Sequence, residues 1–136
     1  MSQPLLEVKN LKVSFHTYAG EVQAVRGVDF TLDAGKTMAI VGESGSGKTV
    51  TSKAVMGLIA SPPGEVKKES SILFEGTDIL RFTEKQWQDY RGKDAAMIFQ
   101  DPMTSLDPTM KIGRQIMESI VEHQKVGKRE AMQRAV

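Results

Sequence analysis

The chain has 136 residues, of which 40% are apolar, and its 18 Lys and Arg against 17 Asp and Glu leave a net charge of +1. That length fits a single domain with a buried core, and the balanced charge excludes the concentrated basic surface of a typical nucleic-acid-binding protein. The absence of cysteine excludes disulfides and thiolate sites, and the absence of a signal-peptide pattern or a long apolar run predicts a soluble, cytoplasmic chain.

Three strands are expected in the first third of the chain. Residues 5–15 (LLEVKNLKVSF) and 22–32 (VQAVRGVDFTL) are rich in β-branched and apolar residues with partial alternation, and the loop HTYAGE at 16–21 separates them. The short continuous apolar run TMAIV at 37–41 is typical of a parallel strand covered on both faces.

Helices and strands then alternate. A helix is expected over residues 48–59, ended by the sequence SPPG, and a strand over 70–76. Thr83 has the character of an N-cap for a short helix over residues 84–91. The run AAMIF at 95–99 predicts a second buried strand.

The end of the chain predicts helices. Ile112, Ile116 and Ile120 are spaced one helical turn apart, and Gly127 separates this helix from a last helical segment. Antiparallel pieces first and β-α-β pieces later indicate an α/β architecture with a small β-subdomain.

The sequence GESGSGKT at residues 42–49 matches the phosphate-binding pattern G-x-x-x-x-G-K-[ST] in full, between a predicted strand and a predicted helix. Its glycines let the backbone curl so that N–H groups turn inward as an anion nest, and the first turn of the helix adds its dipole. Lys48 can reach the β- and γ-phosphates of ATP, and the Thr49 hydroxyl can ligate Mg²⁺. A glycine-rich turn with a solvated lysine is the alternative, but the motif and its flanks agree independently. The candidate nucleotide-binding residues of this segment are Gly42, Glu43, Ser44, Gly45, Ser46, Gly47, Lys48, Thr49 and Val50.

Two longer stretches carry a family resemblance. AVRGVDFTLDAGKTMAIVGESGSGKT and MIFQDPMTSLDPTMKIGRQI resemble the ATP-binding subunits of ATP-binding-cassette (ABC) transporters, and most closely those of oligopeptide and dipeptide importers. The resemblance runs from about Leu5 to the end of the chain. It implies an α/β P-loop NTPase core with an N-terminal antiparallel β-subdomain, and an ATP-binding component that powers peptide import. The implied divisions are a β-subdomain over residues 1–34, a P-loop core over 35–110 and the start of a helical subdomain over 111–136.

Gln100 falls where this family keeps its Q-loop glutamine. The resemblance implies that its side-chain oxygen contacts Mg²⁺ or the attacking water when nucleotide is bound, so Lys48 and Gln100 are the candidate catalytic residues and Thr49 and Gln100 the candidate metal ligands. An amide suits this role because it can accept and donate hydrogen bonds without adding a charge. Read without the family, Gln100 is a polar residue at a strand end ahead of an Asp-Pro turn.

Adenine needs a flat apolar platform, and the family places an aromatic residue four positions beyond a leucine after the first strand. In this chain these are Leu11 and Phe15. Tyr18, in the longer loop before Gly20, is a rival for the same role, since stacking is possible on either ring. Phe15 could instead be an alternating core residue of the strand.

The resemblance also implies partners. Transmembrane permease subunits are expected near the Q-loop, from Gln100 to Met110, with Met103 favoured over Met97 as an interface residue. A second, homologous ATPase subunit is expected as a hetero-partner. Nucleic acid is not expected as a partner. The expected location is peripheral, on the cytoplasmic face of the cell membrane.

Several motifs that family members carry further along do not occur in these 136 residues. There is no LSGGQ-like signature, no Walker B strand with its aspartate and catalytic glutamate, and no switch histidine. The chain therefore resembles the N-terminal part of a longer subunit, truncated before the signature motif. The family implies an ATPase that drives translocation, but the part present here is expected to bind nucleotide without hydrolysing it.

Two other classes of function remain open from sequence alone. A non-transport cassette ATPase, of DNA-repair or translation type, is disfavoured by the sequence QDPMTSLDP at residues 100–108. An unrelated phosphate-loop enzyme, such as a small-molecule kinase, would lack the leading β-subdomain and would need acceptor-site residues that the sequence does not show.

Overall fold

The computed structural model describes residues 3–101 and 105–136. These residues fall into two units, Met1–Trp87 and Gln88–Val136, and the boundary between them lies within helix α2 (Glu84–Tyr90).

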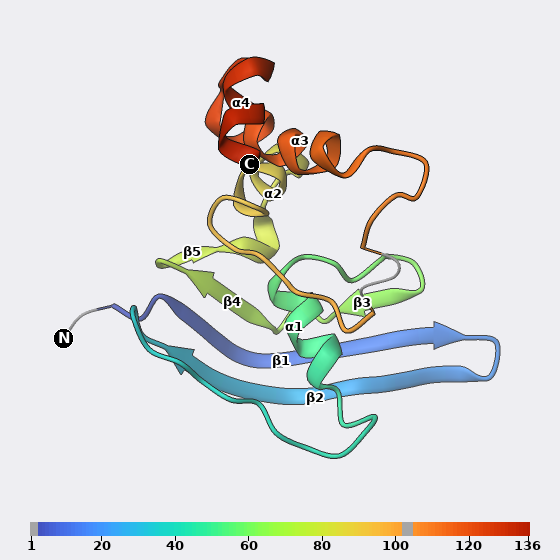
Figure 1. Ribbon diagram of the computed structural model, residues 1–136. Helices are drawn as coiled ribbons and strands as arrows, with labels where there is room; N and C mark the ends of the chain where they lie inside the picture. The colour runs from blue at the N-terminus through green and yellow to red at the C-terminus, as the bar shows by residue number, and fades with distance from the viewer. Residues whose placement is uncertain (1–2, 102–104) are drawn as a thin grey trace. The chain divides into compact units, whose positions relative to one another are not determined.

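Strand β1 (Leu6–Thr17) is the centre of an antiparallel sheet in the first unit (Figure 1). It pairs with β2 (Gly20–Leu32) on one edge, and on the other edge with β3 (Gly64–Val66) and β4 (Ser71–Phe74), while β5 (Thr77–Asp78) pairs with β4. The two strands expected at the start of the chain are therefore confirmed. They are longer than expected and leave only a tight turn at residues 18–19 between them.

The core of this unit lies on one side of β1. Val8, Leu11, Val13, Ile72 and Ile79 are each at most 1% exposed. Ile79 comes from the 3-10 helix η1 (Ile79–Arg81), which follows β5 directly. Alternating apolar residues of β1 and β4 thus supply the apolar contact that holds the sheet and the following helical turn together.

Helix α1 (Lys48–Val55) is shorter than the sequence predicts. The chain leaves the helix at Gly57, which has a left-handed φ of +61°, and the Gly57 N–H donates to the Ala54 carbonyl at 3.0 Å. A Cβ on Gly57 would lie 2.6 Å from the Trp87 ring, so this position also requires glycine for space. The expected end at residue 59 is wrong, because the left-handed Gly57 after the C-cap residue Met56 ends the helix before the SPPG sequence is reached.

The start of α2 is as the sequence predicts. The Thr83 N–H donates to Gln86 Oε1 at 2.9 Å, and the Gln86 N–H donates back to Thr83 Oγ1 at 3.4 Å. This reciprocal pair is a capping box. Trp87, one residue on, packs edge-on to Phe82 with ring centroids 5.4 Å apart.

Both buried strands expected from continuous apolar runs are wrong. Residues 37–41 have no strand pairing, and Ile40 and Val41 are 44% and 90% exposed. In residues 95–99, only Ala95 makes a bridge, to Arg91, while Ile98 is fully exposed. A parallel strand needs neighbours that satisfy its backbone groups on both sides, and within the described residues none pairs with either run beyond that bridge.

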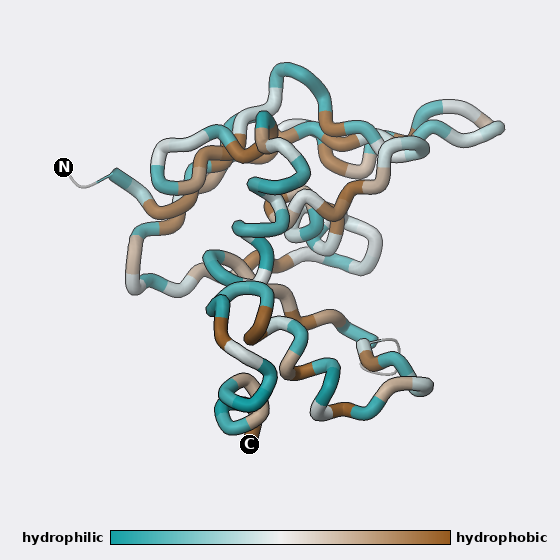
Figure 2. The backbone as a smooth tube through the Cα atoms, turned by 90° about the horizontal axis from the view of Figure 1, so that it is seen from above, coloured by the Kyte–Doolittle hydropathy of each residue, from teal (hydrophilic) through white to brown (hydrophobic). Residues whose placement is uncertain are grey.

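The second unit contains helices α3 (Ile112–Gln124) and α4 (Lys128–Ala135), separated at Gly127 as expected. Ala131 of α4 is fully buried, and Gly113 of α3 faces the Met132 side chain. Hydrophilic and hydrophobic positions alternate along these helices near the C-terminus (Figure 2). Within the part of the chain that the structure describes, no helix is long and apolar enough to cross a membrane.

Candidate phosphate-binding site

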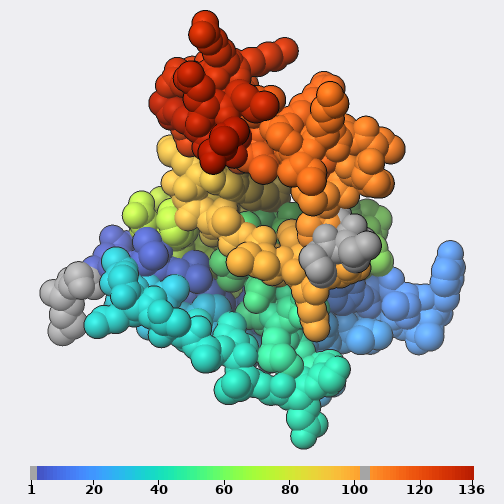
Figure 3. Space-filling view, in the orientation of Figure 1, coloured from blue at the N-terminus to red at the C-terminus, as the bar shows by residue number. Residues whose placement is uncertain are grey.

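The segment from residue 42 to residue 47 forms a curled loop that leads directly into α1. The Ser46 N–H donates to the Glu43 carbonyl at 3.2 Å, which closes a tight turn. Gly45 and Gly47 have left-handed φ angles of +79° and +90°. The loop lies on the surface of the first unit, in the cyan-to-green region of Figure 3. Its backbone is therefore curled as the motif predicts and is open to solvent.

The Lys48 side chain folds back over this loop. Its ammonium donates to the Gly42 carbonyl at 2.7 Å, to the Glu43 carbonyl at 2.6 Å and to Ser46 Oγ at 3.3 Å. These contacts hold a positive charge against the Gly42 and Glu43 carbonyls. A triphosphate bound there would meet a cation that is already in place, which lowers the cost of ordering a long side chain.

The first turn of α1 presents backbone donors. Its N-cap is Gly47, which has no side chain to cap them. The Thr51 N–H and the Thr51 hydroxyl both donate to the Gly47 carbonyl, at 2.8 and 3.0 Å, which fixes the start of the helix. Thr49 is exposed and Val50 is half-buried. Helix N-termini of this kind bind anions through free N–H groups and the helix dipole.

Strand β2 shapes the loop from outside the motif. A Cβ on Gly47 would lie 2.5 Å from the Ala24 carbonyl oxygen and 3.4 Å from Val25 Cγ2. The backbone of β2 therefore approaches Gly47 so closely that only glycine fits. The sequence did not reveal this contact, because Ala24 and Gly47 are far apart in the chain and neither residue carries a pairing signal.

The two aromatic candidates for the adenine platform differ in their surroundings. Phe15 is half-buried, pairs with Gly64 of β3, and its ring lies 3.1 Å from the position of a Gly64 Cβ. Tyr18 lies in the turn between β1 and β2 and is fully exposed. Phe15 is thus packed against β3, whereas Tyr18 is open to solvent.

Gln100 is exposed and lies in the second unit. Its approach to Lys48, Thr49 or a metal ion stays a prediction. Met103 lies outside the described residues. Further along, the Asp107 side chain accepts from the Thr109 N–H at 2.8 Å and from the Thr109 hydroxyl at 2.6 Å, and these bonds lower the pKa of Asp107.

The residues present fit a magnesium-bound nucleoside triphosphate. A tight glycine-rich turn, an ammonium group and a helix N-terminus are features that phosphate-binding loops share. The exposed Thr49 hydroxyl is a hard oxygen donor of the kind that Mg²⁺ prefers. Glu43 is the one acidic residue in the sequence of residues 42–50, and its backbone carbonyl accepts a hydrogen bond from Lys48.

Comparisons with known proteins identify relatives of this chain. A family model described as ABC transporter matches residues 25–136. The oligopeptide transport ATP-binding protein OppD of Bacillus subtilis is 61% identical over 132 residues, which cover 97% of this chain and 37% of that protein. The dipeptide transport ATP-binding protein DppD of Lactococcus lactis is 56% identical over 135 residues, covering 98% and 38%. The probable D,D-dipeptide transport ATP-binding protein DdpD of Escherichia coli is 41% identical over 136 residues, covering 100% and 41%. The chain thus spans well under half the length of these curated relatives.

Proposed function

The chain belongs to the ABC transporter family, and on that basis we propose that it is the nucleotide-binding part of an ATPase subunit that powers peptide import. Membership confirms the predicted fold class, a P-loop NTPase core with an N-terminal antiparallel β-part. It also excludes an unrelated phosphate-loop kinase. Of the transport and non-transport cassette ATPases, the transport class is favoured because the relatives are named as oligopeptide and dipeptide transport proteins.

One observation carries the proposal: the Lys48 ammonium is held over the curled backbone of residues 42–47 by the Gly42 and Glu43 carbonyls. In this arrangement Lys48 would bind the β- and γ-phosphates of ATP, the N–H groups of residues 44–50 would surround the remaining phosphate oxygens, and Thr49 would ligate Mg²⁺. Phe15 is proposed to stack on adenine. Gln100 is proposed to complete the metal and water site.

The partners and location follow from the same premise and are also proposals. A subunit of this kind works at the cytoplasmic face of the membrane against transmembrane permease subunits, with residues 100–110 as the proposed contact. A second, homologous ATPase subunit is the proposed hetero-partner. Transported solutes are proposed to be short peptides, since the relatives' names specify oligopeptides and dipeptides.

We propose that these 136 residues alone do not hydrolyse ATP. Phosphoryl transfer to water requires an oriented water and stabilisation of charge on the γ-phosphate. Lys48, Thr49 and Gln100 supply part of that, but the sequence has no signature motif and no Walker B carboxylates. The proposed activity of this chain by itself is Mg²⁺-dependent ATP binding.

The test is calorimetric titration of the purified chain with ATP, with and without Mg²⁺, for the wild type and Lys48→Ala. A charge-assisted contact contributes about 1.5–3 kcal/mol, so Lys48→Ala should weaken ATP binding roughly ten- to hundredfold. Lys36→Ala is the matched control, because Lys36 is exposed and precedes the loop. Equal affinity for the wild type and Lys48→Ala would refute the proposed site.

A further inference from the structure

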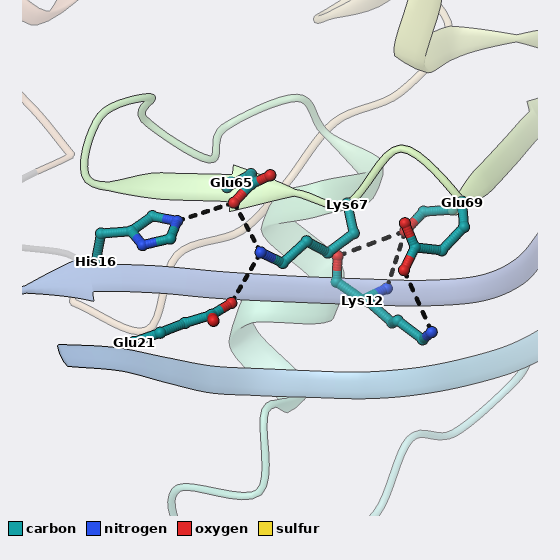
Figure 4. Close-up of polar contacts among 7 residues, drawn as sticks. Lys12, His16, Glu21, Glu65, Lys67 and Glu69 are labelled. Carbon is teal, nitrogen blue, oxygen red and sulfur yellow. Dashed lines mark hydrogen bonds and ion pairs between the residues drawn. The ribbon is translucent and has the colours of Figure 1, made fainter.

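A charged cluster lies on the polar face of the sheet, beside the closed end of the β1–β2 hairpin. It consists of His16, Glu21, Glu65 and Lys67, which we call the Lys67 network (Figure 4). The Lys67 ammonium lies 2.8 Å from a Glu21 carboxylate oxygen and 2.8 Å from a Glu65 carboxylate oxygen. His16 Nε2 lies 2.8 Å from the same Glu65 oxygen. Lys67 thus connects side chains from β2 and β3, and Glu65 connects them to β1 through His16.

The strand register explains why these side chains meet. His16 pairs with Glu21 across the hairpin, and Ser14 pairs with Glu65, so all four side chains project from the same face. Phe15 is paired with Val22 and Gly64 and projects from the opposite face. The Lys67 network and the Phe15 ring therefore lie on opposite faces of the sheet, at the place where β1, β2 and β3 are side by side.

The cluster is not proposed as a metal site, although His16, Glu21 and Glu65 offer ligand atoms within 4.8 Å of one another. Lys67 bonds to both carboxylates and supplies the cation that they require. Hydrogen bonds from Lys67 and then Ser14 lower the pKa of Glu21, and bonds from Lys67 and then His16 lower that of Glu65. Hydrogen bonds to Glu21 and Glu65 in turn raise the pKa of Lys67.

Stability alone does not account for this arrangement. The side chains are 25% exposed at Lys67, 38% at Glu21, 42% at Glu65 and 55% at His16. Ion pairs with this exposure contribute little to the free energy of folding. They do add a side-chain link from β3 to β2, beside the point where Phe15 packs on Gly64 and where β3 is otherwise paired only with β1. The His16 N–H, which donates to the Pro63 carbonyl at 2.9 Å, extends the same attachment.

We propose that the Lys67 network positions Phe15 as the adenine platform, so that Lys67 is a positioning residue for the base although it does not touch the nucleotide. This inference rests on the proposed function, and specifically on Phe15 as the stacking residue. A platform fixed before binding costs less conformational entropy when adenine arrives. Loss of Lys67 removes the side-chain link between β3 and β2, so that Gly64 can shift against the Phe15 ring.

The experiment compares binding of ATP and of inorganic triphosphate, both with Mg²⁺, to the wild type, Lys67→Met and Lys67→Arg. Lys67→Met should weaken ATP binding by about two- to tenfold, the range for residues that act through packing, and should leave triphosphate binding unchanged. Lys67→Arg should restore ATP affinity, because a guanidinium can bond both carboxylates. Lys68→Met is the matched control, since Lys68 is the exposed neighbour on the same segment, and it should bind both ligands as the wild type does.

The outcomes separate this inference from the function on which it rests. If the wild type binds neither ligand, the proposed function fails. If the wild type binds ATP more tightly than triphosphate but Lys67→Met keeps that difference, or if both ligands weaken equally, the positioning role is overturned. Should Lys67→Met fail to fold, Glu21→Gln removes one partner at constant shape and must reduce ATP affinity selectively for the inference to hold.

Discussion

The two left-handed glycines of the phosphate loop permit a matched experiment. Gly45 has a φ of +79° and no atom within 4 Å of a Cβ, whereas Gly47 has a φ of +90° and the Ala24 carbonyl oxygen 2.5 Å from a Cβ. Alanine at either position has to adopt a left-handed conformation, at a cost of about 1–2 kcal/mol. Only at residue 47 does the new methyl group also collide with the backbone of a neighbouring strand.

The magnitudes follow from this difference. The exposed loop around Gly45 can relax when no ligand is bound, so the cost of Gly45→Ala should appear in affinity, as a loss of roughly 5- to 30-fold in ATP binding. At Gly47 the overlap must be relieved by moving β2 or the start of α1, and forced packing of this kind typically costs a further 1–3 kcal/mol or so. Gly47→Ala should therefore weaken ATP binding at least about fivefold more than Gly45→Ala.

The assay is calorimetry with ATP and Mg²⁺, together with thermal unfolding of each variant without ligand. Gly47→Ala should lower the unfolding temperature, because β2 belongs to the core sheet, and Gly45→Ala should leave it nearly unchanged. Equal losses of affinity and equal unfolding temperatures for the two variants would refute the claim that β2 shapes the phosphate loop.

Four further predictions follow from other parts of the chain. Phe15→Ala should weaken ATP and GTP binding to a similar extent and leave inorganic triphosphate binding unchanged in calorimetry; a larger effect from Tyr18→Ala would transfer the platform to Tyr18. Thr83→Ala removes the side-chain half of the capping box of α2 and should lower the free energy of unfolding by about 0.5–2 kcal/mol in denaturant titration, with Lys85→Ala on the same helix as control. Thr109→Val removes the hydroxyl bond to Asp107 and should therefore raise the pKa of Asp107 toward its ordinary value in an NMR titration. In the wild type the lowered pKa stabilises the fold at neutral pH, and that stabilisation is lost as the pH falls through the pKa of Asp107 in the folded protein. The chain should release no phosphate from ATP above background; multiple-turnover release abolished by Lys48→Ala would contradict this.

What the sequence predicted well is held by neighbours close in the chain. The loop at residues 42–47 is closed by a bond between Glu43 and Ser46, and α2 starts at a cap formed by Thr83 and Gln86. Each of these depends on residues only three apart, so the residue types and their spacing are sufficient. The hairpin of β1 and β2 was predictable for the same reason, because its strands are adjacent in the sequence.

What the sequence did not predict depends on contacts between distant residues. Glu65 and Lys67 join His16 only because β3 returns to pair with β1, and no local pattern specifies that return. Gly57, where the chain leaves α1, lies against the ring of Trp87, thirty residues away in the sequence, and no local pattern specifies that contact. The His16 side chain is exposed, and its partner Glu65 could not be named from spacing.

The apolar run at residues 37–41 does not form the expected strand, although the phosphate loop that follows it is formed. Val41 is 90% exposed although its residue type and neighbours favour a buried strand. A strand has no internal hydrogen bonds, so the apolar pattern indicates only that such a segment would be stable between partner strands, and no described residue pairs with it.

The phosphate loop does not depend on partner strands in this way. Its curl is held by the bond from Ser46 to Glu43, by Lys48 folded over the Gly42 and Glu43 carbonyls, and by β2 against Gly47. Nucleotide binding can therefore be tested in this chain without first requiring that residues 37–41 form a strand.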